Sequence, residues 1–295
     1  MSTSIKQAAS IASFLGSQSS KPLRQPVSQI RPAKFWEKID LHELWAHREV
    51  LYFLVWRDLK VRYKQTVAGT AWVLLQPLLM TLVFAVFLGG FMHAPSDGIP
   101  YPIFAFSAML LWTFTSTAIL SSSYSLVTNS QIITRIYFPR VILPISAIGV
   151  RLVDFTIASV VLFGFMIYYR VGVGPQILIL PLLILEMTAL ALAVGVLTAA
   201  LYVRYRDVGT LLPIALQVWM FVSPTVYATS VVPSKFRFIY SLNPLVGIMN
   251  GFRAALFNLP LDWTSVAIST VVILFLTIAS LQIFQMLDSS FADEV

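Results

Sequence analysis

Residues 176–201 read QILILPLLILEMTALALAVGVLTAAL, an apolar run in which Glu186 is the one ionisable residue. A helix of about 20 predominantly apolar residues is long enough to cross the hydrocarbon core of a bilayer. This stretch exceeds that length. It therefore predicts a transmembrane helix, and with it a fold in which lipid takes the place of water around much of the chain.

Other parts of the chain have the same character. Five stretches qualify by length and apolar content: residues 70–92, 101–125, 141–169, 176–201 and 263–287. A sixth, residues 209–228, is shorter and is interrupted by Pro213 and Pro224, but it carries no charge. The sequence therefore predicts an all-α polytopic membrane protein with six transmembrane helices.

The composition agrees with a membrane protein. Hydrophobic residues make up 58% of the chain and charged residues 11%, whereas soluble domains are about one quarter charged. The net charge of +7 does not indicate nucleic acid, because the basic residues lie beside apolar spans rather than on a soluble face. The absence of cysteine excludes disulfides and thiol catalysis.

The distribution of Lys and Arg predicts the orientation. With six spans, one side holds the N-terminal region and the loops 126–140 and 202–208, with eleven, two and two Lys or Arg residues. The other side holds four. We therefore expect a multi-pass protein with both termini in the cytosol.

Three regions precede or interrupt these spans. Residues 1–35 are rich in Ser, Gln and Pro, which predicts a disordered cytosolic tail. Residues 36–66 contain a predicted amphipathic helix, 41–60, which would lie in the headgroup region as a gate or as a plain anchor. Its apolar side comprises Leu41, Leu44, Trp45, Tyr52, Val55 and Leu59. Residues 67–295 form the predicted six-span domain.

The cytosolic loop 126–140 predicts a short helix over residues 130–138. Asn129 or Ser130 can cap its start, and Pro139 disfavours helical geometry at the preceding residue. Apolar side chains fall on one face of this helix: Ile132, Ile133, Ile136 and Tyr137. Either a protein partner or the membrane interface would cover that face.

The segment 229–260 is apolar but contains scattered polar and basic residues, which are costly against lipid. A re-entrant pair of short helices over about 229–258, broken at Asn243–Pro244, fits this pattern, and a surface loop is the alternative.

Ionisable residues also occur inside the spans. Arg151 and Asp154 are three residues apart, which predicts an intramembrane ion pair. Glu186 has no partner nearby in sequence, so we expect it to face the bundle in a helix–helix hydrogen bond, with a proton relay as the alternative.

The sequence lacks the motifs of several common catalytic chemistries. The sequence has no Gly-Lys dipeptide, and so no P-loop, and it has neither Gly-x-Ser-x-Gly nor His-Glu-x-x-His. Its three histidines, His42, His47 and His93, are not spaced as metal ligands. We expect no enzyme activity, no metal site and no bound cofactor.

Together the motifs resemble the membrane permease subunit of ABC transporters that export polysaccharides such as O-antigen, capsule and teichoic acid. The matching pieces span about residues 40–290 in family order. They are WRDLKVRYKQT (56–66), Gly69 and Trp72, QPL (76–78), IYFPR (136–140) with Pro144, YRDV (205–208), SPTVY (223–227), and LNP (242–244) with Arg253.

The resemblance implies a homodimeric permease in a bacterial inner (plasma) membrane. It further implies two copies of a separate ATPase subunit that holds ATP and Mg²⁺, a polyprenyl-pyrophosphate-linked glycan as substrate, and membrane lipids around the spans. The loop helix would be the coupling helix that meets the ATPase, through Gln131, Ile132, Ile133, Arg135, Ile136 and Tyr137.

The resemblance also implies roles for other residues. The interface or gate helix would act through Trp45, Trp56, Arg57, Asp58 and Arg62. The outer gate would include Pro224, Tyr227, Asn243 and Pro244. Aromatic residues that could line a sugar-conducting channel are Phe84, Phe87, Trp112 and Tyr124, although aromatic residues also commonly face lipid.

Alternative functions share parts of this pattern. An ABC permease that exports a drug or a lipid would have the same spans and coupling helix. An ion-coupled flippase would use Glu186. A membrane-embedded enzyme would need a polar catalytic cluster, which the sequence lacks.

Overall fold

The structure, a computed structural model, describes residues 41–64 and 71–288, and all regular secondary structure within these ranges is helical. The helices are α2 (Leu41–Ala46), α3 (Arg48–Lys64), α4 (Ala71–Phe84), η1 (Ala85–Phe91), α5 (Tyr101–Thr128), α6 (Ser130–Ile133), α7 (Ile142–Tyr168), η2 (Pro175–Ile179), α8 (Leu180–Arg204), α9 (Val208–Val222), η3 (Thr229–Val231), η4 (Ser234–Phe236), α10 (Arg237–Ser241), α11 (Pro244–Phe257) and α12 (Trp263–Asp288). The predicted tail, residues 1–35, lies outside the described residues.

Within the described ranges, five helical stretches are long and apolar enough to cross a membrane. They are Ala71–Phe91, Tyr101–Thr128, Ile142–Tyr168, Pro175–Arg204 and Trp263–Asp288. They match the five clear stretches of the sequence. The predicted sixth span corresponds to α9, which has 15 residues. Its length of about 22 Å is shorter than the hydrocarbon core of about 30 Å.

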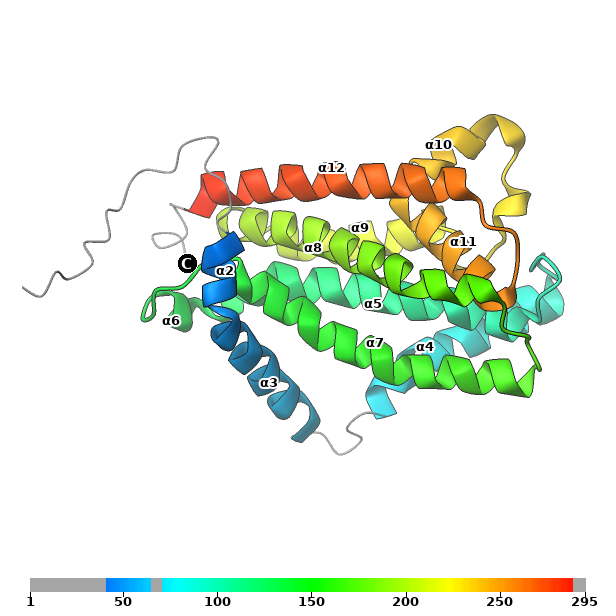
Figure 1. The fold of residues 1–295 in the computed structure, drawn as a ribbon, viewed down its shortest axis with the longest axis horizontal. Helices are drawn as coiled ribbons and strands as arrows, with labels where there is room; N and C mark the ends of the chain where they lie inside the picture. Colours follow the sequence, from blue (N-terminus) through cyan, green and yellow to red (C-terminus); the bar gives the residue numbers. More distant parts are fainter. Residues whose placement is uncertain (1–40, 65–70, 289–295) are drawn as a thin grey trace, which may run out of the picture. The chain divides into compact units, whose positions relative to one another are not determined.

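Helix α5 is the centre of the bundle. It packs between α7 and α8, while α12 lies on α8 (Figure 1). The rings of Phe106 in α5 and Phe165 in α7 meet edge to face at 5.1 Å. Gly247 lets α11 approach α12 closely, because a Cβ atom there would collide with Ser265 and Ser269. By contrast, most side chains of α4 are exposed, as expected of a surface that faces lipid or another chain.

The predicted interface helix consists of two helices separated by a turn at His47. Leu54 is 3% exposed, whereas Trp45 and Tyr52, which belong to the side predicted to meet the headgroup region, are both 70% exposed. Leu54 packs into an apolar cluster with Leu126 and other residues at this end of the bundle. The helix therefore packs one side on the bundle, and Trp45 and Tyr52 of the predicted apolar side remain exposed. The placement of that side in the headgroup region stays a prediction.

The helix predicted over residues 130–138 is shorter in the structure, where α6 ends at Ile133. The Thr134 hydroxyl donates to the carbonyl of Ser130 at 3.2 Å, and residues 134–139 continue as turns and irregular chain. We call residues 129–140 the α6 loop.

Two groups of elements lie at opposite ends of the bundle (Figure 1). The α3 end contains α2, α3 and α6. The α10 end contains α10 and the loop before α5. The break predicted at Asn243–Pro244 is present there, because α11 begins at Pro244 and the Asn243 side chain accepts a hydrogen bond from the Leu245 N–H at 3.2 Å.

Candidate functional site

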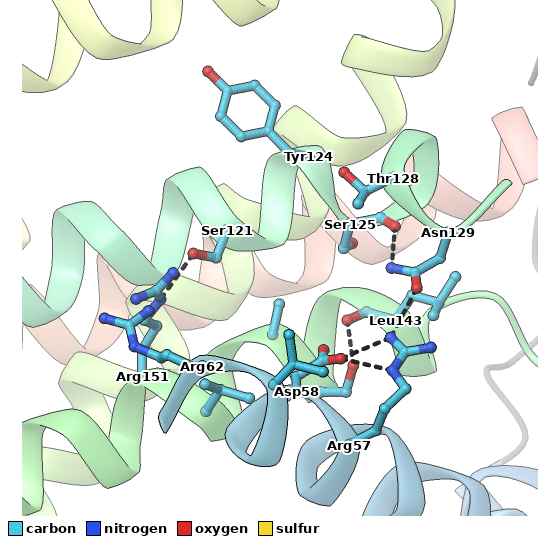
Figure 2. A pocket seen from close by; sticks show the side chains of 14 residues that line it. Arg57, Asp58, Arg62, Ser121, Tyr124, Ser125, Thr128, Asn129, Leu143 and Arg151 are labelled. Carbon is cyan, nitrogen blue, oxygen red and sulfur yellow. Dashed lines mark hydrogen bonds and ion pairs between the residues drawn. The ribbon is translucent and has the colours of Figure 1, made fainter. Parts of the chain in front are cut away.

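A pocket of about 370 Å³ opens between α3, α5 and α7 at the α3 end (Figure 2). Its lining combines guanidinium, hydroxyl, amide and carboxylate groups with a few apolar side chains. The polar and charged residues are Arg57, Asp58, Arg62, Ser121, Tyr124, Ser125, Thr128, Asn129, Ser146 and Arg151. Three arginines and several neutral donors around one cavity are suited to bind an anion, since guanidinium groups recognise phosphate with paired hydrogen bonds.

Asp154 of α7 lies beside the pocket and holds α3 in place. It is 8% exposed and accepts from Arg62 at 3.0 Å, from Arg151 at 3.2 Å and from the Tyr63 hydroxyl at 2.5 Å. Burial, followed by the hydrogen bond to Asp154, raises the pKa of Tyr63, so this phenol stays a neutral donor. The ion pair predicted from the spacing of Arg151 and Asp154 is therefore present, with two further partners from α3.

Gly149 allows this contact between α3 and α7. A Cβ atom at Gly149 would lie 3.2 Å from a methyl group of Val55. An alanine there would require Val55 to shift by a few tenths of an ångström. The small residue helps to bring Arg62 within reach of Asp154.

Arg57 forms the other side of the pocket. Its guanidinium contacts Asp58 at 2.7 Å and donates to the side-chain oxygen of Asn129 at 2.9 Å. Figure 2 shows Arg57 and Asn129 on one side of the cavity, and Arg62 and Arg151 on the other. Arg151 also donates to the Ser121 hydroxyl at 2.8 Å.

The sequence analysis did not predict a pocket here, although it assigned other roles to several of the lining residues. Arg57, Asp58 and Arg62 were assigned to the interface helix, and all three line the cavity. Trp45 and Trp56 do not; they are exposed by 70% and 55%. Tyr124 of α5 was suggested only for a channel, and the meeting of α3, α5 and α7 was missed because residues far apart in sequence form it. The charge of Arg151 inside a span was the available signal, but it was read only as half of an ion pair.

The predicted coupling residues divide into two groups. Ile132 and Ile133 pack against the apolar cluster that contains Leu54. The others are exposed: Gln131, Arg135, Ile136 and Tyr137. Ile136 is 60% exposed and Tyr137 85%. These last two side chains therefore form the accessible apolar part of the loop.

The predicted outer-gate residues come together at the α10 end. Asn243 accepts from the Trp219 indole at 3.0 Å and donates to the Ser223 hydroxyl at 2.9 Å. The Tyr240 hydroxyl donates to that of Tyr227 at 3.1 Å. Burial and this hydrogen bond raise the pKa of Tyr240. The segment after α9 is thereby tied to the start of α11.

Arg253 of α11, to which the sequence analysis gave no role, is the centre of this region. It is 4% exposed and donates to the carbonyls of Pro224 at 2.8 Å, Thr225 at 3.0 Å and Phe104 at 3.3 Å. Its guanidinium also lies 3.5 Å from the Phe104 ring centroid. Arg253 thus joins the segment after α9 to α5.

The four aromatic residues suggested for a channel do not form one surface. Trp112 is buried in the core, with its ring 6.4 Å from that of Trp219. Tyr124 lines the pocket, and its hydroxyl donates to the Gly209 carbonyl at 2.9 Å. Phe84 and Phe87 belong to α4 and η1, and Phe87 is 58% exposed.

Glu186 faces the bundle as expected. It is 6% exposed and accepts from the Thr270 hydroxyl of α12 at 2.6 Å. Its second carboxylate oxygen is buried with no hydrogen-bond partner among the described residues. The predicted helix–helix hydrogen bond is therefore present.

These features define a polytopic helical membrane protein with a basic pocket at one end of its bundle. Residues 49–257 match the family described as ABC-2 type transporter. The match covers most of the chain, and the chain belongs to this family. The resemblance to an ABC permease that the motifs indicated is confirmed at this level.

Two relatives extend the comparison. The chain is 26% identical over 248 residues to the O-antigen export system permease protein RfbA of Klebsiella pneumoniae, covering 83% of this chain and 94% of that protein. It is 27% identical over 260 residues to the protein of the same name from Myxococcus xanthus, covering 86% and 98%. In both cases the alignment includes the pocket-forming helices.

Proposed function

We propose that this chain is the transmembrane subunit of an ATP-driven exporter that moves a polyprenyl-pyrophosphate-linked polysaccharide out of the cytosol across the inner membrane. The pocket formed by α3, α5 and α7 is the observation that carries this proposal. Its three guanidinium groups suit the pyrophosphate, and its position beside the amphipathic helix suits a substrate that arrives within the membrane. The names of the two relatives support a polysaccharide as the cargo.

The proposal also covers assembly and topology. Two copies of the chain form the conduit. Two copies of a separate ATPase subunit bind the α6 loops and supply the energy by hydrolysing ATP. Helix α9 crosses the membrane as the sixth span, with the adjoining residues completing its length. Segment 229–258 enters without crossing, so both termini lie in the cytosol. The α10 end then faces outward.

The test is a lipid-binding measurement on the complex of this chain with its ATPase subunit in nanodiscs. We expect a polyprenyl pyrophosphate to bind, and polyprenol, which lacks phosphate, to bind far more weakly. Arg151→Gln removes one guanidinium but leaves Asp154 bonded to Arg62. Because a charge-assisted hydrogen bond contributes about 1.5–3 kcal/mol, affinity for the pyrophosphate should fall roughly tenfold or more.

Arg170→Gln is the matched control, because Arg170 is an exposed arginine in the turn after α7 and lies outside the pocket. Its affinity should equal that of the unmodified chain. The pocket would be ruled out as a pyrophosphate site if the Arg151 variant bound the pyrophosphate as tightly as the unmodified chain does. The same holds if polyprenol bound as tightly as polyprenyl pyrophosphate. In cells, deletion of the chain should leave the polysaccharide in the cytosol; normal surface polysaccharide would rule out the export function.

A further inference from the structure

Asn129 occupies the junction between α5, which ends at Thr128, and α6, which begins at Ser130. Its backbone N–H and its side-chain NH₂ both donate to the Ser125 carbonyl, at 3.2 and 2.9 Å. Its own carbonyl accepts from the N–H groups of Ile132 at 2.9 Å and Ile133 at 3.2 Å. One residue therefore fixes the end of α5 and the start of α6 relative to each other.

The remaining polar atom of Asn129, its side-chain oxygen, accepts from Arg57 of α3 at 2.9 Å. Asn129 does not cap α6 with its side chain, although the sequence suggested that role. The side chain instead connects the pocket wall to the α6 loop (Figure 2). The three helices α3, α5 and α6 thus meet at this one amide.

Arg57 can exchange this partner. Its side chain is 32% exposed, it lines the pocket, and its second partner is the carboxylate of the adjacent Asp58. A guanidinium bonds more strongly to an anion than to a neutral amide oxygen. An anionic group that enters the pocket therefore competes well for Arg57, and the amide of Asn129 is the partner it displaces most readily.

Loss of this hydrogen bond would leave the α6 loop attached but less constrained. Ile132 and Ile133 pack against the apolar cluster that also contains Leu54 of α3. Apolar contacts tolerate small rotations and shifts, whereas a hydrogen bond fixes direction. The loop would keep its place at the α3 end and gain freedom to reorient.

We propose that the Arg57–Asn129 hydrogen bond reports the occupancy of the pocket to the α6 loop. This inference rests on the proposed function. With the pocket empty, Arg57 holds Asn129 and the loop stays in a resting orientation. When a pyrophosphate takes Arg57, Asn129 is released and the loop adopts the orientation that activates the ATPase subunit. Asn129 acts as a positioning residue, and its role is to make ATP hydrolysis depend on substrate.

The experiment measures ATP hydrolysis by the complex of permease and ATPase subunits in nanodiscs of phosphatidylethanolamine and phosphatidylglycerol. The probe is a sugar-free polyprenyl pyrophosphate, with polyprenol as the control. We expect the unmodified complex to be stimulated by the pyrophosphate. Asn129→Leu removes the acceptor for Arg57, so hydrolysis without lipid should rise to the stimulated rate and the response to lipid should be lost. Its binding of the pyrophosphate should persist.

Asn129→Asp should act in the opposite direction. The carboxylate holds Arg57 more tightly, so the pyrophosphate concentration for half-maximal stimulation should rise by about threefold or more. A role limited to packing would move both variants in the same direction. Asn129→Asp loses the donation from the side-chain NH₂ to Ser125, but it keeps the size of the side chain and the backbone N–H that donates to the same carbonyl. It therefore provides the test by itself if the Leu variant does not assemble. Thr156→Ala, on an exposed position of α7, is the neutral control.

The outcomes separate this inference from the proposed function. The inference that the Arg57–Asn129 hydrogen bond acts as a relay from the pocket to the α6 loop would be overturned by either of two results. One is retained lipid stimulation in Asn129→Leu, and the other is an unchanged pyrophosphate concentration for half-maximal stimulation in Asn129→Asp. An unmodified complex that binds the pyrophosphate without stimulation would overturn the relay and leave the proposed function standing. A complex that does not bind the pyrophosphate would overturn both.

Discussion

The two ends of the bundle use arginine in opposite ways. At the α10 end, Arg253 is 4% exposed and donates to three backbone carbonyls. At the α3 end, the side chains of Arg57, Arg62 and Arg151 are 32%, 35% and 21% exposed and form ion pairs beside a cavity. A buried guanidinium surrounded by carbonyls has no other partner to move to, whereas a half-exposed one can exchange a carboxylate for another anion.

The comparison distinguishes an arginine whose charge stabilises the fold from arginines whose charge is available to bind an anion. Arg253 fixes the segment after α9 against α5, so the α10 end depends on it for its shape. The arginines of the pocket hold α3 against α5 and α7 through contacts that an anionic ligand can replace. Substitutions at the two ends should therefore separate loss of stability from loss of binding.

Arg253→Met should have the largest effect on stability. The change leaves the carbonyls of Pro224, Thr225 and Phe104 buried without this donor, at a cost on the order of 3 kcal/mol or more. Thermal unfolding of the detergent-purified chain measures it. Arg237→Met, an exposed arginine whose bond to the Val232 carbonyl is 3.3 Å, is the matched control and should change little. Equal unfolding temperatures for the two variants would contradict the structural role of Arg253.

Asp154→Asn should have a smaller effect, concentrated on α3. The amide cannot replace the carboxylate that pairs with Arg62 and Arg151, and we expect a loss of about 1–3 kcal/mol. Tryptic cleavage within Arg48–Lys64 should accelerate, because α3 separates more often from α7. Asp58→Asn removes a half-exposed pair and should cost under about 1 kcal/mol. Unchanged cleavage in Asp154→Asn would show that other contacts hold α3.

The sequence predicted the parts of the structure that depend on composition and local spacing. The five long spans follow from apolar length, the break at Asn243 from Pro244, and the ion pair of Arg151 from its distance of three residues to Asp154. These features need no information about which helices are neighbours.

The sequence could not predict features that depend on tertiary contacts. The pocket requires α3, α5 and α7 to meet, and the face of α3 that is buried is set by the cluster around Leu54 rather than by its own periodicity. Arg253 has partners 28, 29 and 149 residues away, so no local pattern reveals them. Helix α6 ends at Ile133, well before Pro139, and no local spacing marks that point.

Substitutions in the α6 loop should distinguish packing from partner binding. Ile136 is 60% exposed, so Ile136→Asp should change stability by less than about 0.5 kcal/mol. Under the proposed function, it should nevertheless release the ATPase subunit and stop export.

Ile133 packs into the cluster of the α3 end, so Ile133→Asp should also destabilise the chain. Co-purification of the ATPase subunit and unfolding temperature measure the two effects. Normal co-purification and export with Ile136→Asp would place the ATPase contact elsewhere.

Glu186→Gln should have a small effect on stability and, under ATP-driven export, the smallest effect on transport. Glutamine keeps the side-chain oxygen that accepts from Thr270 at 2.6 Å, and the Thr270 hydroxyl is also within 2.9 Å of the Val266 carbonyl. The expected change in stability is within about 1 kcal/mol.

Under ATP-driven export, transport should continue at nearly the normal rate, since the driving force comes from another subunit. Under ion-coupled transport, the same variant would fold and assemble normally but lose transport, because an amide cannot take up and release a proton. Export is measured in cells that express the variant and the unmodified chain at equal levels. The result decides whether Glu186 joins α8 to α12 or drives the transport cycle.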